Sequence, residues 1–382
     1  MNPMTQYRKI VTQARRVVLK VGSGVLTRDN GLDLKLIRSL ADDISHCRQE
    51  NREIILVSSG AIASGLKKVG LTEKPRTVQQ KQACAAIGQA SLIMAYENSL
   101  NRYGHKVAQI LLTFDDLSNR RRYLNARNTL TTLLEWDIIP IINENDTVAV
   151  DEIKFGDNDT LSSLITTLVE ADLLVNLTDI DGLFDRDPRQ DPKARFIPLV
   201  KTIGPKIEAL AGSIPGAMGM GGMYAKVIAA KRVAKTGVPT VIANGKKKGI
   251  LKRILAGEAE GTLFLPRPKR LERRKHWIAY TARVRGRIVV DDGAKKALLK
   301  HGKSLLPSGI TRIKDQFSLG DSVEVVDRRG RPVAVGLTNY SSGELNQILG
   351  CQTDEIEGRL GYKHSDEIIH RNNMVVGKDL LA

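Results

Sequence analysis

Cysteines and aromatic residues are both scarce in this sequence of 382 residues. The three cysteines, Cys47, Cys84 and Cys351, are far apart, form no Cys-x-x-Cys pair and have no histidine at metal-ligand spacing. This pattern indicates neither a disulfide framework nor a structural zinc site, and it is typical of buried thiols. Aromatic residues make up only 4% of the chain, so platforms for stacking nucleic-acid bases are few.

Long hydrophobic runs are also missing. The longest apolar runs have the length of a strand, and Lys20 and Gly22 interrupt the only candidate for the apolar part of a secretory signal. We therefore expect no membrane span and a cytoplasmic location. With 42% hydrophobic residues the chain can bury a full core, and its length suggests two or three domains.

The chain carries a formal net charge of +17, which suits a nucleic-acid partner, an enzyme with anionic substrates, or solubility alone. The densest basic stretches are Lys246–Lys248 and Arg267–Lys275; Pro266 precedes the second and Pro268 interrupts it. Prolines among charges are typical of an exposed boundary between domains. The predicted division is a first domain, a basic linker, and a second domain with the C-terminal tail, at residues 1–265, 266–275 and 276–382.

Apolar runs typical of strands alternate with helical patterns in the first two thirds of the chain. This alternation predicts an α/β fold with an open, mostly parallel sheet sandwiched by helices. The predicted strands are Val17–Leu26, Glu53–Ser58, Lys106–Thr113, Asp137–Asn143, Asp172–Thr178 and Pro239–Ala243, and the predicted helices include Leu34–Arg48, Arg127–Leu134, Leu161–Glu170 and Val227–Thr236.

Polar clusters follow several of these strands. Asn143-Glu144-Asn145-Asp146 comes directly after a buried apolar run, and Phe155-Gly156-Asp157-Asn158-Asp159 follows shortly after it. Open α/β sheets bind ligands beyond the carboxyl ends of their strands. The two clusters therefore predict a ligand site at that edge of the sheet.

Two further segments suit a phosphate group. Lys20 precedes the turn Gly22-Ser23-Gly24, although a solvent-exposed lysine would fit equally well there, and Gly219–Lys226 places glycines before a helix. A P-loop is rejected because Leu66 stands at the position of its lysine, and a dinucleotide fingerprint because Thr27 replaces its third glycine. A calcium loop fails because Leu168 stands where its glutamate belongs.

One ordered set of motifs runs along the chain: Lys20 with Gly22-Ser23, Ser58–Ala61, Asn143–Asp146, Gly156–Asp159, Thr178-Asp179, and Gly221–Met223 with Lys226. The whole set resembles the glutamate 5-kinases of the amino-acid kinase family. The resemblance implies ATP-dependent phosphorylation of the L-glutamate side-chain carboxylate, the first step of proline synthesis. A kinase of the same family for another carboxylate or carbamate is the nearest alternative.

The same resemblance implies roles for individual residues. Hydroxyl and amide donors hold the glutamate carboxylates and an acidic residue pairs with the α-ammonium, with magnesium bridging the ATP phosphates through few direct protein ligands. Asp159 would orient the two catalytic lysines, and it also suits a helix N-cap before Leu161. The implied residues are Ser59, Asp146 and Asn158 for glutamate; Lys20, Thr178, Asp179, Met220, Gly221, Gly222, Met223, Tyr224, Ala225 and Lys226 for ATP; and Lys20, Lys226 and Asp159 for catalysis.

The glycine loop departs from the family pattern at Met220, where threonine is common, and at Tyr224-Ala225, where small hydroxyl residues are common. Loss of a hydroxyl there would alter contacts with phosphate. Neither departure removes a charged group on which the proposed chemistry depends.

The last third predicts a small, mostly β domain with short strands at Ile288–Val290, Ser322–Val326 and Val333–Leu337. Lys303–Ile310 and Gly320–Val323 resemble a PUA domain, a fold that many RNA-modifying proteins use to bind RNA. An RNA-binding or RNA-modification protein is therefore the rival interpretation, although it leaves the polar clusters unexplained. The kinase resemblance also suggests inhibition by proline, a homo-oligomer, and a glutamyl phosphate reductase partner.

Overall fold

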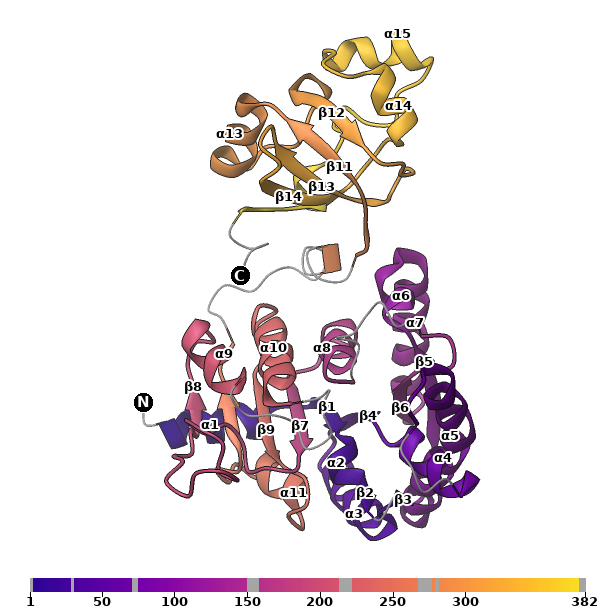
Figure 1. The fold of residues 1–382 in the computed structure, drawn as a ribbon, viewed down its shortest axis with the longest axis vertical. Coiled ribbons are helices and arrows are strands. Elements are labelled where there is room, and N and C mark those ends of the chain that lie inside the picture. Colours follow the sequence, from indigo (N-terminus) through magenta and orange to yellow (C-terminus); the bar gives the residue numbers. More distant parts are fainter. Residues whose placement is uncertain are drawn as a thin grey trace. The chain divides into compact units, whose positions relative to one another are not determined.

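The computed structural model describes residues 3–28, 31–70, 75–149, 158–212, 222–266, 277–278 and 282–377. The chain forms two compact units, one made of residues 1–117 and 121–270 and the other of residues 118–120 and 271–382. Figure 1 draws both units, and each is described by itself. No helix among the described residues combines the length and the apolar character needed to cross a membrane.

An eight-stranded sheet forms the centre of the first unit. Its strands follow the order β5-β6-β4-β1-β7-β9-β10-β8, and only the pairing of β9 with β10 is antiparallel. This confirms the predicted open, mostly parallel sheet. The strands are β1 Arg16–Val21, β4 Glu53–Ser58, β5 Val107–Leu112, β6 Ile139–Glu144, β7 Leu173–Thr178, β8 Leu199–Val200, β9 Thr240–Asn244 and β10 Thr262–Phe264, and a separate small hairpin pairs β2 Thr27–Arg28 with β3 Gly31–Leu32.

Helices cover both faces of this sheet, with α3 and α11 on one face and α8 and α10 on the other (Figure 1). The predicted layering of helices around the sheet is therefore also confirmed. The helices are α1 Pro3–Gln13, α2 Ser23–Leu26, α3 Leu34–Gln49, α4 Ala61–Val69, α5 Val78–Leu100, η1 Asn101–Tyr103, α6 Phe114–Ser118, α7 Arg120–Glu135, α8 Asn158–Leu168, α9 Pro205–Gly212, α10 Met223–Ala234 and α11 Ile250–Leu255.

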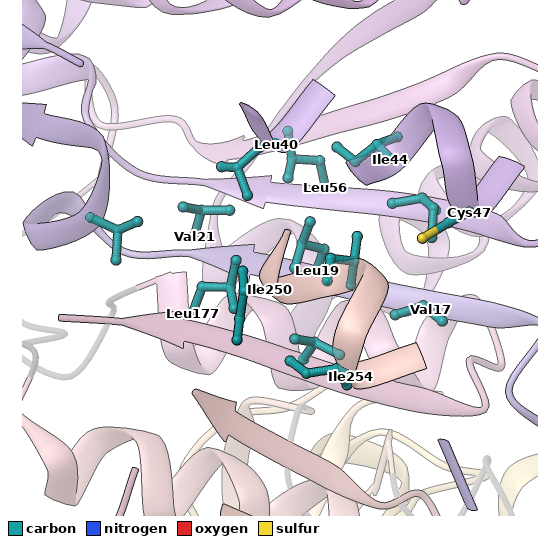
Figure 2. Close-up of a cluster of buried hydrophobic side chains, with 14 of the residues drawn as sticks. Val17, Leu19, Val21, Leu40, Ile44, Cys47, Leu56, Leu177, Ile250 and Ile254 are labelled. Atoms are coloured by element: carbon teal, nitrogen blue, oxygen red, sulfur yellow. The ribbon is translucent and has the colours of Figure 1, made fainter. Parts of the chain in front are cut away.

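The core around β1 explains why Lys20 faces α8. Side chains alternate between the two faces of a strand, and Val17, Leu19 and Val21 point into the apolar cluster under α3 and α11 (Figure 2). Val18 and Lys20 therefore point to the opposite face, where α8 packs on β1. The buried residues from the other elements of this cluster that Figure 2 labels are Leu40, Ile44, Cys47, Leu56, Leu177, Ile250 and Ile254.

The first predicted strand, Val17–Leu26, was too long. Strand β1 ends at Val21, and the short helix α2 begins at Ser23. Between them, the N–H of Gly22 donates a hydrogen bond to the carbonyl of Leu177 at the end of β7, 3.1 Å away. This is the last hydrogen bond between the segment of β1 and strand β7, and the chain then enters the helical turn of α2.

The second unit contains a five-stranded sheet with the order β12-β11-β13-β14-β15, in which only β11 and β13 pair in parallel. This confirms the predicted small, mostly β domain, whose core surrounds Ile288, Val325 and Tyr340. Its elements are β11 Val284–Val290, α13 Asp292–His301, η2 Pro307–Gly309, β12 Ile310–Lys314, β13 Ser322–Asp327, β14 Pro332–Leu337, α14 Ser342–Gln347, η3 Thr353–Glu355, α15 Ile356–Leu360, η4 Arg371–Asn373 and β15 Met374–Val376.

Candidate active site

One buried carboxylate lies between two buried lysines at the end of β1. Lys20 Nζ is 2.7 Å from Asp159 Oδ1, and Lys226 Nζ is 3.1 Å from Asp159 Oδ2. The three residues are 4%, 1% and 5% exposed in the order Lys20, Asp159, Lys226. They come from β1, α8 and α10, so the sheet and two helices together build this triad.

Strand register brings a fourth residue to the same carboxylate. Lys20 in β1 lies opposite Asn176 in the parallel strand β7, so both side chains point to the face covered by α8. Asn176 Nδ2 donates a hydrogen bond of 2.7 Å to Asp159 Oδ1. Asn176 was not predicted as a site residue, and the only signal for it is an amide inside an otherwise apolar buried strand.

Asp159 lies in the first turn of α8, not before it. The helix begins at Asn158, so the predicted N-cap role of Asp159 is wrong. The backbone of Asp159 is already helical, and its carboxylate is occupied by the two ammonium groups and by Asn176. The electrostatic attraction of the lysines, and not the capping of free N–H groups, holds this side chain.

The electrostatics of the triad favour an anionic ligand. Burial by itself raises the pKa of Asp159, but the nearby charges of Lys20 and Lys226 and the hydrogen bonds from Lys20 and Asn176 outweigh it and lower the pKa to about 2. Asp159 is therefore ionised at neutral pH. Two ammonium charges and one carboxylate charge leave one net positive charge in a buried place, which a phosphate oxygen can neutralise.

A second group of polar residues lies next to the triad along the chain. Asn158 Nδ2 is 2.9 Å from Ser59 Oγ, after β4, and 3.0 Å from Asn143 Oδ1, in β6. The structure therefore brings together two of the three residues predicted to bind glutamate. The third, Asp146, lies in the turn that follows β6 and is partly exposed, at the same edge of the sheet.

Thr178 and Asp179 lie at the end of β7, beside the turn that follows β1. The Thr178 hydroxyl donates a hydrogen bond of 3.2 Å to Asp179 Oδ1. A Cβ atom built on Gly24, in α2, would be 3.6 Å from the carboxylate of Asp179, so α2 and this side chain are in contact distance. The predicted nucleotide residues of β1 and β7 therefore share one edge of the sheet.

Only part of the predicted glycine loop can be located. Met220 and Gly221 lie outside the described residues. Gly222 is the residue before α10, and Met223 is buried. Tyr224 is 44% exposed, and Ala225 is partly exposed. Lys226 follows them in the first turn of α10, where its side chain reaches Asp159.

Within the described part of the chain, no group of three or more histidine, cysteine, aspartate or glutamate side chains could hold a metal ion. Both oxygens of Asp159 are within ion-pair distance of a lysine, so this carboxylate does not fit as a metal ligand. The two ammonium groups at this place fit the anionic phosphate groups of a nucleotide.

Comparison with known proteins gives matches over both units. The profile of the amino acid kinase family matches residues 15–244, and that of the PUA domain matches residues 286–360. Glutamate 5-kinase from Geobacter sulfurreducens is 53% identical over 368 residues, which cover 96% of this chain and 99% of that protein. Glutamate 5-kinase from Caldanaerobacter subterraneus is 54% identical, over 94% of this chain and 97% of that protein.

Among solved structures, carbamate kinase from Giardia lamblia bound to AMP-PNP aligns with a TM-score of 0.48 at 17% identity, over 67% of this chain and 100% of that chain. The relatives at about half identity are matched over nearly their full length.

Proposed function

Because the chain belongs to the amino acid kinase family, among the glutamate 5-kinases, we propose that it uses ATP to phosphorylate the side-chain carboxylate of L-glutamate. The product is glutamyl 5-phosphate, the first intermediate of proline biosynthesis. The observation that carries this proposal is the buried carboxylate of Asp159, which holds the amines of Lys20 and Lys226 side by side.

The chemistry needs positioning more than it needs a base. The accepting carboxylate of glutamate is already ionised at neutral pH, because its ordinary pKa is about 4. Catalysis then consists of in-line placement of the two reactants and neutralisation of the charge that spreads over the transferred phosphoryl group. Lys20 and Lys226 supply that neutralisation, and Asp159 keeps their amines close together.

Glutamate binds, in this proposal, between the ends of β4 and β6 and the first turn of α8. Ser59, Asp146 and Asn158 contact it, with the carboxylate of Asp146 pairing with the α-ammonium group. The hydrogen bond between Asn158 and Ser59 supports this arrangement, because it joins two of these residues before any ligand is bound.

ATP binds on the other side of the triad, over the ends of β1 and β7 and the start of α10. Thr178, Asp179 and the loop from Met220 to Lys226 contact the nucleotide. Among the described residues, no side chain caps the N-terminus of α10, where the positive end of the helix dipole lies, and both features favour phosphate. Magnesium, when bound with ATP, neutralises part of the phosphate charge.

Regulation and partners follow from the same proposal. Proline, the end product, competes near the glutamate site, and the labile acyl phosphate passes to a glutamyl phosphate reductase. The protein acts in the cytoplasm as a homo-oligomer. An inhibition assay with proline and light scattering on the purified protein test the first and the last of these statements.

A hydroxamate assay tests the activity itself. Purified protein is incubated with ATP, magnesium and hydroxylamine, and with L-glutamate, L-aspartate or N-acetyl-L-glutamate as acceptor. We expect acyl hydroxamate from glutamate in large excess over the other two. Lys226→Met should abolish the signal, whereas Lys231→Met, on the same helix but paired with Glu208 at 2.8 Å, should retain it. An equal signal from aspartate or N-acetylglutamate would overturn the substrate assignment.

A further inference from the structure

A line of hydrogen-bonded amides leads from helix α5 into the proposed glutamate site. Gln89 Oε1 accepts from Asn143 Nδ2 at 2.8 Å, and Asn143 Oδ1 accepts from Asn158 Nδ2 at 3.0 Å. Asn158 Nδ2 also donates to Ser59 Oγ at 2.9 Å. These contacts connect α5, β6, α8 and the residue after β4 in a single chain of side chains.

The line of amides has a fixed direction from acceptor to donor. A side-chain amide has one end that only donates and one that only accepts, so each link orients the next. Asn143 Oδ1 accepts from the backbone N–H of Glu144 at 2.9 Å as well as from Asn158, so its nitrogen must face the other way. Gln89 provides the acceptor for that nitrogen. Asn143 is 2% exposed, so loss of Gln89 would leave its side-chain N–H group buried and without the acceptor that it now bonds, which costs stability.

The last link leaves a buried acceptor at the site. The amide nitrogen of Asn158 donates to Ser59 Oγ, to Asn143 Oδ1 and, more weakly at 3.4 Å, to the Ser58 carbonyl, so it is engaged within the protein. Its Oδ1 is buried and has no hydrogen-bond partner among the described residues. A buried acceptor of this kind is satisfied by a donor, and an ammonium group offers three donors and no acceptor. An ionised carboxylate offers no donor and so cannot satisfy it.

Packing of α5 against α4 fixes the position of Gln89, where the line of hydrogen-bonded amides begins. Gly88, next to Gln89, lies so close to α4 that an added Cβ would be 1.9 Å from the carbonyl oxygen of Ala61. Ala61 is the first residue of α4, two residues after Ser59. The position of Gln89 relative to Ser59 is therefore set by direct backbone contact between the two helices.

Resting on the proposed function, we propose that Gln89 is a positioning residue for recognition of the α-ammonium group of glutamate. Gln89 orients Asn143, Asn143 orients the amide of Asn158, and Asn158 then presents Oδ1 to the ammonium group. Asn158 thus selects an amino acid by accepting a hydrogen bond, and the carboxylates of the substrate are held by other donors.

The test compares two substitutions at one position. Gln89→Met keeps the length of the side chain and removes the acceptor, whereas Gln89→Glu keeps an acceptor for Asn143. Gln79→Met, at an exposed position on the same helix, is the matched control. Each protein is assayed with L-glutamate and with glutarate, which lacks the α-amino group, and the thermal midpoint is recorded with and without L-glutamate.

For Gln89→Met we expect the KM for L-glutamate to rise about tenfold, the scale of one lost hydrogen bond to a charged group. We expect kcat, the KM for ATP and the rate with glutarate to change less than about twofold, since those interactions do not involve the ammonium group. The thermal shift produced by glutamate should shrink in parallel. Gln89→Glu and Gln79→Met should stay near wild type in every measurement.

Three outcomes would overturn the inference. One is a Gln89→Met variant with an unchanged KM for glutamate. A second is an equal loss with glutarate and glutamate, which would mean a general disturbance of the site. A third is a Gln89→Glu variant as impaired as Gln89→Met. Failure of the proposed function looks different, because then the wild-type protein itself would not phosphorylate glutamate, and both proposals would fall.

Discussion

Replacing Lys226 by methionine removes the charge and nearly keeps the length of the side chain. In the wild type the amine is buried and lies 3.1 Å from Asp159. A charge about 4 Å from developing negative charge contributes roughly 4 kcal/mol at an effective dielectric constant near 20, which corresponds to about a thousandfold in rate. We therefore expect Lys226→Met to lower kcat about a thousandfold while the KM for glutamate changes less than about threefold.

Stability has to be separated from catalysis in this variant. Removing one partner of a buried ion pair typically costs about 3–5 kcal/mol, because the other charge stays buried. Lys20 and Asn176 still bind Asp159 Oδ1, so we expect a loss at the lower end of that range. The double variant Lys226→Met/Asp159→Asn removes the carboxylate that balances the charge of Lys20, so it should be less stable than Lys226→Met and should not regain turnover.

Steady-state rates of ADP formation, with glutamate and ATP varied in turn, measure these effects. Lys231→Met on the same helix serves as the control and should keep normal kinetics. A Lys226→Met enzyme with near-normal kcat and a raised KM for glutamate would refute the assignment, because the lysine would then bind substrate and not the transition state. Equal slowing by Lys231→Met would mean that any change in α10 disturbs the site.

The remaining predictions concern acid stability and helix packing. Between about pH 5 and pH 2, the wild type should lose about 2 kcal/mol of stability relative to Asp159→Asn, because the pKa of Asp159 is about 2 in the folded state against an ordinary 3.8. This stabilisation is complete above the unfolded pKa and is lost as the pH falls through the folded one; urea unfolding at several pH values measures it, and a constant difference would contradict it. Gly88→Ala should lower stability by about 1–3 kcal/mol or more and raise the KM for glutamate, because the new Cβ would overlap Ala61 in α4. Thermal unfolding and kinetics, with the exposed Ala90→Ser as control, test this, and an unchanged midpoint would show that α4 and α5 separate without cost.

The central strands of the first unit could be predicted from sequence because a buried parallel strand is a short, continuous apolar run. Strand β4 has the predicted bounds Glu53–Ser58, and β7 begins one residue after the predicted start at Asp172. Polar residues directly after such runs had to meet at one edge, since the carboxyl ends of parallel strands lie together. Asn143–Asp146 could be predicted as a site segment for this reason.

The contacts inside the site could not be predicted from the sequence in the same way. Nothing local to β1 or α10 indicates that Lys20 and Lys226 share a carboxylate, and only the family resemblance suggested it. Asn176 and Gln89 lie in segments whose patterns burial and helix formation already explain. Their roles depend on the direction in which an amide points, which tertiary neighbours decide, so no spacing in the sequence could reveal them.

The first turn of α8 connects the two halves of the proposed reaction. Asn158 is bound to Ser59 and Asn143 on the glutamate side, and the adjacent Asp159 is bound to Lys20 and Lys226 on the phosphate side. Consecutive residues of one helical turn cannot move independently, so the distance between the amino acid and the lysines is fixed by the backbone of α8. In the proposed reaction, which depends on in-line placement, this rigid link supplies the alignment and the lysine charges supply the rate.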